Sequence, residues 1–216
     1  MVSSGKKLKY PIVEEFLEEV LSTFWDLLIE SGEIDVDEDV INKITEEVKN
    51  GVLNNCPLYV FVRENKKSLE VFRFATRKPM TEADFYPHMY KKDLRIYCAK
   101  KEIKRRRRSK KYEKWIDWIR SGDFDSLRDD LKKEFCSCFS VSVFANLREA
   151  KSQFSKIRRA KLIVKGQIVQ ERDGFLYSKA LNDKSSHRDW YPWEGVDELK
   201  IFQEVVFERQ EKGKTV

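Results

Sequence analysis

The sequence predicts an α+β protein, with a mostly antiparallel sheet, an N-terminal helical hairpin and a helical, basic insertion. Apolar residues recur every three or four positions between Tyr10 and Glu30, whereas large apolar residues alternate with serine over Phe139–Val143. The first spacing puts apolar side chains on one side of a helix, and the second puts them on one face of a strand. A turn at Asp173-Gly174 between two apolar runs favours antiparallel pairing of its flanking strands.

Two helices are expected within residues 1–55. The first extends from Tyr10 to about Glu30 and is stopped by Ser31-Gly32. The second begins near Asp35 or Asp37 and ends at Asn50-Gly51. Their apolar faces predict an N-terminal helical hairpin whose role is packing.

Residues 56–216 are expected to form the sheet domain. Apolar and β-branched runs at Leu58–Val62 and Leu69–Ala75 flank a polar stretch and predict a first β-hairpin. The runs Leu162–Val169 and Phe175–Tyr177 predict a second hairpin, and Val205–Phe207 a final strand. We expect these strands to belong to one sheet.

Two spacings predict the start of a helix. Thr81 stands three residues before Asp84, and Asn146 three residues before Glu149. A hydroxyl or amide side chain followed by an acid at this distance can satisfy the free amide groups of a first helical turn. After Asn146 we expect Ala150, Phe154 and Ile157 on the inward side of the helix.

The stretch from about residue 91 to 134 is expected to be an insertion in the sheet domain. It contains a basic run, an apolar pattern at Trp115, Ile116 and Ile119, and a second one at Leu127, Leu131 and Phe135. The two apolar patterns predict two helices. The step Ser121-Gly122-Asp123 combines a stop signal and a start signal and separates them.

Charge and hydropathy limit the partners of the chain. Its 216 residues include 43 Lys and Arg against 37 Asp and Glu, which gives a net charge of +6. This excess permits an anionic partner such as a nucleic acid. No apolar run is long enough to cross a bilayer and no signal-peptide core is present, so we expect a cytoplasmic protein without a membrane partner.

The four cysteines are expected to be reduced and mostly buried. Cys56, Cys98, Cys136 and Cys138 lack paired metal-ligand spacing, and with only two histidines no closed metal site is expected. Cys136 and Cys138 would lie on one face of a strand as core thiols.

The strongest electrostatic feature is a dense basic block. Its centre is the run Arg105, Arg106, Arg107 and Arg108, with five lysines within residues 100–111. Such dense like charge is relieved by a phosphate backbone, so the block is a candidate for nucleic-acid binding. The alternative is a solvated loop balanced by the acids Asp123, Asp125, Asp129 and Asp130.

A second candidate is the polar and aromatic stretch Ser185–Gly195, expected to be a loop. His187 could act as a general acid or base near neutral pH, with Asp189 to orient it. One of the rings of Trp190, Tyr191 or Trp193 could stack on a base or a nicotinamide ring. The alternative is that the aromatic side chains cover a sheet edge and serve packing.

Four segments read together resemble small uncharacterised bacterial proteins, and more distantly the ADP-ribosyltransferase fold. The segments are Phe72–Phe85, Phe139–Ala150, Ile163–Ile168 and Ser186–Trp193. The more distant resemblance implies that Arg73 or Arg77 pairs with the pyrophosphate of NAD. It also implies that Ser140 or Ser142 contacts the nicotinamide ribose. The late acids Glu198, Glu204 and Glu208 depart from the catalytic spacing of the commonest bacterial class.

The first functional hypothesis is a small nucleotide- or NAD-handling domain, in which the strand arginine, the serine face and the stretch around His187 surround one cleft. The alternative is a non-enzymatic nucleic-acid-binding protein, phage- or defence-related, that uses the basic block. A third hypothesis is a homodimer formed by the N-terminal helices, through Phe24, Trp25 and Leu28.

Overall fold

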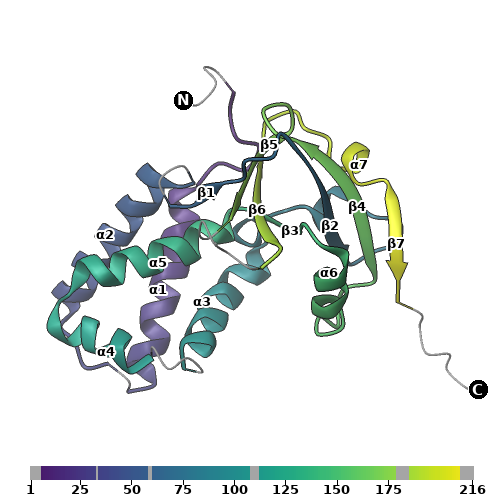
Figure 1. Cartoon of the computed structure of the whole chain (residues 1–216). Coiled ribbons are helices and arrows are strands. Elements are labelled where there is room, and N and C mark those ends of the chain that lie inside the picture. The colour runs from purple at the N-terminus through teal and green to yellow at the C-terminus, as the bar shows by residue number, and fades with distance from the viewer. Residues whose placement is uncertain (1–5, 33, 58–59, 108–111, 179–184, 210–216) are drawn as a thin grey trace, which may run out of the picture. The chain divides into compact units, whose positions relative to one another are not determined.

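The computed structural model describes residues 6–32, 34–57, 60–107, 112–178 and 185–209 (Figure 1). The chain divides into two units, each made of separate stretches of sequence. The helical unit comprises Tyr10–Val62 and Pro87–Ser140, and the sheet unit comprises Met1–Lys9, Arg63–Tyr86 and Val141–Val216. The division into a helical hairpin at 1–55 and a sheet domain at 56–216 stays a prediction.

The helical unit is built mainly from helices. Its elements are α1 (Glu14–Glu30), α2 (Glu38–Asn55), the 3₁₀ turn η2 (His88–Tyr90), α3 (Lys92–Arg107), α4 (Tyr112–Ser121) and α5 (Phe124–Cys138). The apolar stripe of α1 is buried, with Leu17, Leu21 and Leu28 fully inside a core shared by the helices of the unit. The predicted N-terminal hairpin of α1 and α2 and the two predicted helices after residue 111 are confirmed.

Helix α2 runs past the predicted stop at Asn50-Gly51 and ends at Asn55. Gly51 lies inside the helix, where it faces α5. A Cβ atom placed on it would come within 3.2 Å of the Lys132 side chain. The glycine therefore permits a close approach of two helices. The sequence alone does not distinguish this role from that of a helix stop.

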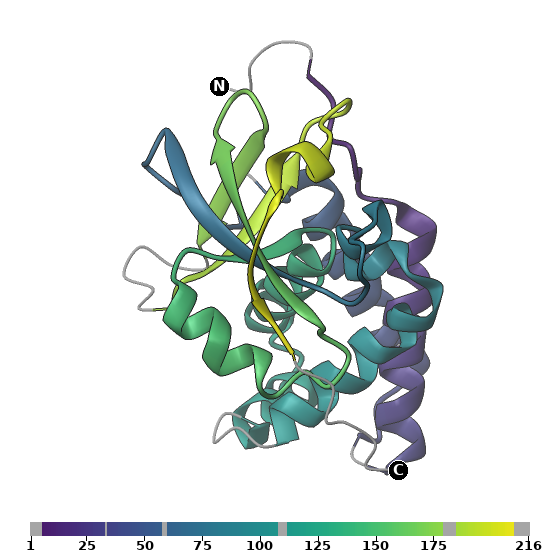
Figure 2. The same cartoon turned by 90° about the vertical axis from the view of Figure 1, so that its right-hand side faces the viewer.

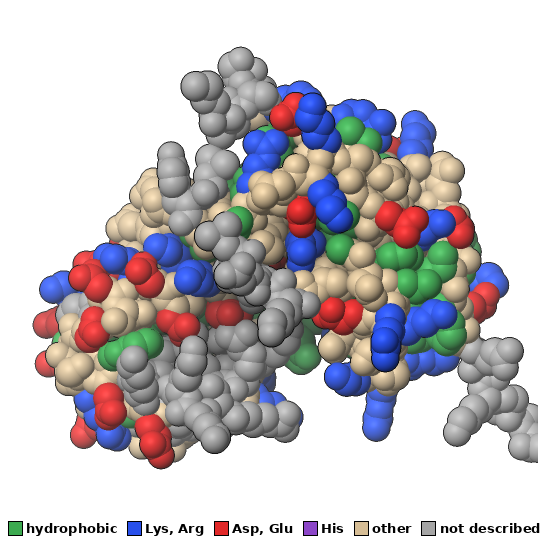
Figure 3. All heavy atoms as spheres, viewed as in Figure 1, with side chains coloured by type: hydrophobic (Ala, Val, Ile, Leu, Met, Phe, Trp, Pro, Cys, Tyr) green, Lys and Arg blue, Asp and Glu red, His purple; other side chains and the backbone are tan. Residues whose placement is uncertain are grey.

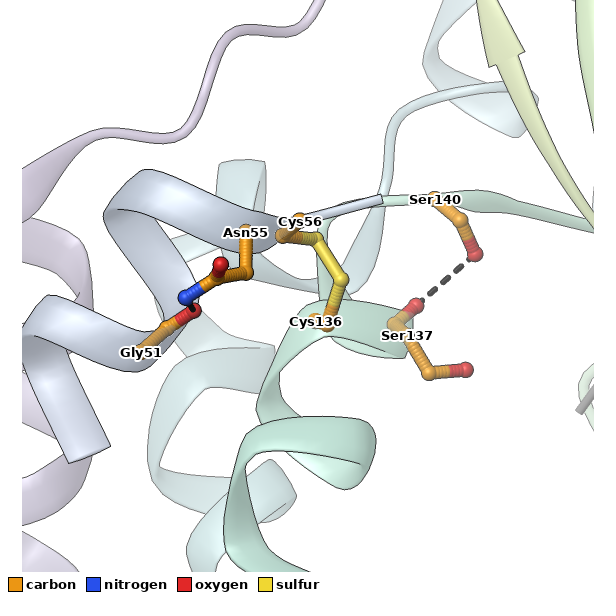
Figure 4. The surroundings of a disulfide bond; sticks show 6 residues. All are labelled: Gly51, Asn55, Cys56, Cys136, Ser137 and Ser140. Atoms are coloured by element: carbon orange, nitrogen blue, oxygen red, sulfur yellow. Dashed lines mark hydrogen bonds between the residues drawn. A yellow bond between two sulfur atoms is a disulfide. The ribbon is translucent and has the colours of Figure 1, made fainter. Parts of the chain in front are cut away.

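A disulfide joins Cys56, directly after α2, to Cys136 in the last turns of α5 (Figure 4). The prediction that all four cysteines are reduced is therefore wrong for this pair, whereas Cys98 and Cys138 form no disulfide bond. The partners are 80 residues apart, so their approach depends on tertiary packing that spacing does not reveal.

The sheet unit has an antiparallel sheet at its centre. Its strands are β1 (Val62–Arg63), β2 (Ser68–Ala75), β3 (Val141–Phe144), β4 (Leu162–Val169), β5 (Gly174–Ser178), β6 (His187–Pro192) and β7 (Glu204–Glu208). Their order across the sheet is β1-β5-β6-β3-β2-β4-β7. Helix α6 (Leu147–Phe154) packs on the face of β2, β3 and β4 that carries Phe72, Phe144 and Ile163 (Figures 1 and 2). The short helix α7 (Glu198–Ile201) precedes β7.

Both predicted hairpins are wrong in their pairing, and residues 58 and 59 of the first predicted strand lie outside the described residues. β2 pairs with β3 and β4 instead of β1, and its eight residues match β4 along its full length. β5 pairs with β6 instead of β4. β2 has buried residues on both faces, as a central strand requires, whereas a two-stranded hairpin buries one face.

The predicted strand at Phe139 begins two residues later, at Val141. Phe139 caps the C-terminus of α5, so Cys136 and Cys138 lie on a helix and their predicted strand positions are wrong. The predicted loop after Ser185 is also wrong, because His187–Pro192 forms β6. Consecutive residues of β6 are buried on both faces, which removes the alternation that marks a strand in a sequence.

The two predicted capping motifs are confirmed. The start predicted at Thr81 opens the 3₁₀ turn η1 (Glu82–Asp84), where the Thr81 amide donates to the Asp84 carboxylate at 3.1 Å. The Asn146 side chain accepts a hydrogen bond from the amide of Glu149 at the start of α6. α6 ends at Phe154, so Ile157 lies beyond the helix and is 41% exposed, contrary to its predicted inward position.

Within the described part of the chain, none of the helices is both long enough and apolar enough to span a bilayer.

Candidate functional site

The Arg73 side chain forms hydrogen bonds within the protein. This β2 residue is half-buried, and its Nε and Nη2 atoms donate to the main-chain oxygen of Asp84 at 3.0 and 2.6 Å. Its Nη1 atom donates to the main-chain oxygen of Ser142. The guanidinium thereby fastens the chain after β2 and the neighbouring strand β3 to each other.

Strand register separates Arg73 from the other predicted cofactor contacts. Ser142 pairs with Asp189 and Phe144 pairs with His187, so these four side chains point to one face of the sheet. Phe72 pairs with Phe144 and shares that face. Arg73, its neighbour along β2, therefore points to the opposite face, because successive side chains alternate. The register brings Ser142, Asp189 and His187 together and leaves Arg73 apart.

The remaining residues of the NAD hypothesis range from exposed to fully buried, and Ser140 belongs to the other unit. Arg77 is exposed in the turn after β2. Asp189 and Trp190 have no exposed surface, and Trp190 packs against Phe202 at 5.9 Å between ring centroids. Ser140 belongs to the helical unit, where its hydroxyl donates to the main-chain oxygen of Ser137 (Figure 4).

His187 is half-buried, with its ring edge-to-face on Phe144 at 5.5 Å. Near it lies the carboxylate of Glu149, which sequence spacing marks only as part of a helix cap. Glu149 accepts hydrogen bonds from the Ser186 amide at 2.8 Å and the Ser185 hydroxyl at 3.1 Å. These bonds, the Ser186 amide foremost, hold the pKa of Glu149 below its ordinary value.

The late acidic residues are engaged in ion pairs. Glu198 is fully buried and pairs with Lys9, which also donates to the Val196 main-chain oxygen. On β7, Glu204 pairs with Lys165 and Glu208 pairs with Lys78, both at 2.7 Å.

The basic block is partly placed by the structure. Helix α3 continues to Arg107, so Arg105, Arg106 and Arg107 belong to its last turns. Their side chains, and the whole of Arg108, lie outside the described residues. The alternative of a loop is therefore wrong for the stretch up to Arg107. Sequence periodicity did not predict α3, because its last turns carry charged residues on several sides.

The described part of α3 has one buried side and one exposed side. Leu94, Cys98, Ala99 and Ile103 are buried in the helical core. Arg95 fixes the helix to α1, since its Nη1 atom lies 2.7 Å from Glu19 and its guanidinium lies 3.6 Å from the centre of the Phe16 ring. The exposed side carries Ile96, Tyr97, Lys100 and Lys104, and both Ile96 and Tyr97 are 45% exposed.

The acids proposed to balance the block have partners within α5. Asp125 and Asp129 pair with Arg128, and Asp129 also pairs with Lys132. The Asp123 side chain caps the helix by accepting a hydrogen bond from the Ser126 amide. Stabilising α5 accounts for these three positions.

Phe24, Trp25 and Leu28, proposed to form a dimer contact, are buried in the helical core. The homodimer stays a prediction. Among the described residues no group of three or more His, Cys, Asp or Glu side chains is placed to hold a metal ion.

Searches of known protein families, curated proteins and solved structures find no match for this chain. The resemblance to small bacterial proteins and to ADP-ribosyltransferases stays a prediction. The function must therefore be inferred from the exposed chemistry of the chain itself.

Proposed function

We propose that the protein binds nucleic acid through the exposed side of α3 and the arginine run at its C-terminal end. The observation that supports this most is the combination on α3 of exposed cations, Lys100 and Lys104, with an exposed aromatic ring, Tyr97. Lysine neutralises phosphates and an aromatic ring can stack on a base, and proteins that bind single strands combine the two.

Packing of α3 makes this side available as a rigid surface. The buried side of the helix is held by the apolar core and by the Arg95–Glu19 ion pair. Tyr97 and Lys104 lie seven residues apart, about two helical turns, and therefore on the same side of α3. Arg105, Arg106 and Arg107 follow in the last turns of the same helix.

The NAD hypothesis remains the second proposal. Its residues Ser142, His187 and Asp189 share a sheet face, but Arg73 points away from them and is bonded to main-chain oxygens. Calorimetric titration with NAD tests it, and binding that is lost on Ser142→Ala would support it.

A cytoplasmic location also stays a prediction. The Cys56–Cys136 disulfide favours an oxidising compartment instead, where such bonds persist.

The test of nucleic-acid binding is the affinity of charge variants for a labelled oligothymidylate of about 20 nucleotides, a length that spans several stacking sites. Lys100→Ser/Lys104→Ser should weaken binding by about tenfold at low salt, because two phosphate contacts are lost. Tyr97→Ala should weaken it by about fivefold or more through lost stacking. Replacing Arg105 to Arg108 with serine should abolish retention on a DNA or RNA column.

The matched control is Lys66→Ser/Lys67→Ser, which removes the same charge from exposed positions between β1 and β2. Equal losses in the control and the α3 variant would show a general charge effect and contradict a site on α3. Circular dichroism melting curves show whether each variant remains folded.

A further inference from the structure

A second basic surface lies in the sheet unit, within the 15 residues 147–161. We call it the α6 surface. It consists of exposed cations on α6 and on the turn that follows it, namely Arg148, Lys151, Lys156, Arg158, Arg159 and Lys161. Figure 3 shows lysine and arginine side chains gathered around α6. These cations are dispersed along the chain, unlike the consecutive arginines that end α3, so local charge density does not identify them.

Four of the six cations of the α6 surface have no acidic partner among the described residues. The only acid within residues 147–161 is Glu149, whose carboxylate is bonded to Ser185 and Ser186. In the described part of the chain, no carboxylate lies within ion-pair distance of Arg148, Lys156, Arg158 or Arg159. Such a concentration of unbalanced positive charge favours an anionic ligand.

An apolar groove adjoins these cations. It has a volume of about 460 Å³ and is lined by Lys151, Phe154, Ser155, Phe207, Glu208 and Arg209. Phe207, on the edge strand β7, is 40% exposed, and the Lys151 ammonium lies 5.6 Å from the centre of its ring. The groove therefore places an exposed ring beside a cation.

Contacts behind the groove hold its shape. Phe207 stands edge-to-face on the buried Phe154 at 5.3 Å. Arg209 donates to the main-chain oxygen of Phe154 at 2.8 Å and stacks on the Phe154 ring. Glu208, the acid of the groove, is paired with Lys78. The ring and the cations are thus presented by a preorganised edge of the sheet, which lowers the ordering cost of binding.

We infer that the α6 surface and this groove form a second binding site for single-stranded nucleic acid. A base stacks on Phe207, and the neighbouring phosphates lie against the cations of the α6 surface. Charge alone would also suit an acidic membrane, but a half-exposed ring in a groove lined by cations favours a stacked base. The choice of nucleic acid as the ligand rests on the proposed function of α3.

The test compares variants of the two surfaces on the same oligothymidylate. Arg158→Ser/Arg159→Ser should weaken binding by about tenfold at low salt and should reduce the salt slope by about 1.4, or 0.7 for each lost contact with a single strand. The matched control is again Lys66→Ser/Lys67→Ser, which lies in the same unit. An equal loss in the control overturns the site.

Phe207 tests the stacking step. Phe207→Tyr keeps the ring and should bind as the wild type does, whereas Phe207→Leu keeps bulk without a ring and should bind about fivefold or more weakly. Because Phe207 packs on Phe154, thermal melting of each variant shows whether the substitution has also disturbed the fold. Equal binding by folded Leu and Tyr variants overturns stacking on Phe207.

The outcomes separate the two sites. Loss in the α6 variant with no loss in Lys100→Ser/Lys104→Ser would support the α6 site and contradict the α3 site. Loss in the α3 variant alone would overturn the α6 site and leave the proposed function standing. Stronger retention on vesicles containing phosphatidylserine than on the oligonucleotide, removed by Arg158→Ser/Arg159→Ser, would overturn the nucleic-acid assignment in favour of a membrane surface.

Discussion

At the scale of single residues, two side chains that are typical of binding sites, Arg73 and Asp84, form hydrogen bonds that stabilise the fold. Asp84 accepts hydrogen bonds from the Thr76 amide and hydroxyl and from the Thr81 amide. Arg73 donates to the main-chain oxygens of Asp84 in this turn and of Ser142 on the neighbouring strand β3. Arg73, Thr81 and Asp84, which lie in the first segment of the resemblance, therefore form a local structural unit, and their presence is explained without a ligand.

Glu149 provides a residue-scale prediction. Its pKa is lowered in the folded protein, mainly by the Ser186 amide, so the folded state favours the charged carboxylate. The stabilisation is fully present above the ordinary glutamate pKa of about 4.3 and is lost as the pH falls through the lower folded-state value. Glu149→Gln should therefore lower the free energy of unfolding at neutral pH by on the order of 1 kcal/mol.

Urea denaturation of both proteins from pH 7 to pH 2.5 measures this difference. The gap between the wild type and Glu149→Gln should shrink as the solution becomes acidic. The control Glu194→Gln removes a charge from an exposed position outside this network. A gap that stays constant with pH would contradict the role assigned to the Glu149 carboxylate.

At the scale of elements, the sequence predicts where helices and strands lie better than how they pair. The apolar spacing of α1 and the capping residues of η1 and α6 depend on neighbours a few positions away, and these predictions are confirmed. The partners of β2 and β5 depend on strands distant in the sequence, and both predicted hairpins are wrong. α3 was missed because its charged last turns conceal the apolar spacing of its first ones.

For the candidate sites too, the sequence predicts features that lie in consecutive residues and misses those that depend on strand register or packing. Local density of arginine identified the block that ends α3, because that signal is contained in consecutive residues. The shared face of Ser142 and His187 depends on the register of β3 and β6. The groove beside Phe207 depends on the packing of β7 near α6, which residue spacing does not encode.

The disulfide provides an element-scale prediction, since it links the end of α2 to α5. Protein purified and unfolded without reductant should show two reactive thiols, those of Cys98 and Cys138, in a colorimetric thiol assay. Reduction should expose four and should destabilise the native state by about 2–4 kcal/mol, as loss of a long-range crosslink does. Four reactive thiols before reduction would contradict the bond.

At the scale of the whole molecule, the net charge of +6 understates how unevenly charge is distributed. Acids on α5 and β7 form ion pairs with nearby cations. In contrast, exposed lysine and arginine side chains are concentrated on α3 and on the α6 surface. Binding through both surfaces would release counterions from several phosphates at once. Affinity for a single strand should then fall steeply as salt increases.

The salt dependence of oligothymidylate binding by the wild-type protein tests this account most directly. Fluorescence anisotropy at a series of potassium chloride concentrations gives the slope of log affinity against log salt. We predict a negative slope of about 3 or steeper, which corresponds to four or more phosphate contacts on a single strand. No binding at low salt, or an affinity that does not change with salt, would contradict nucleic-acid recognition by this protein.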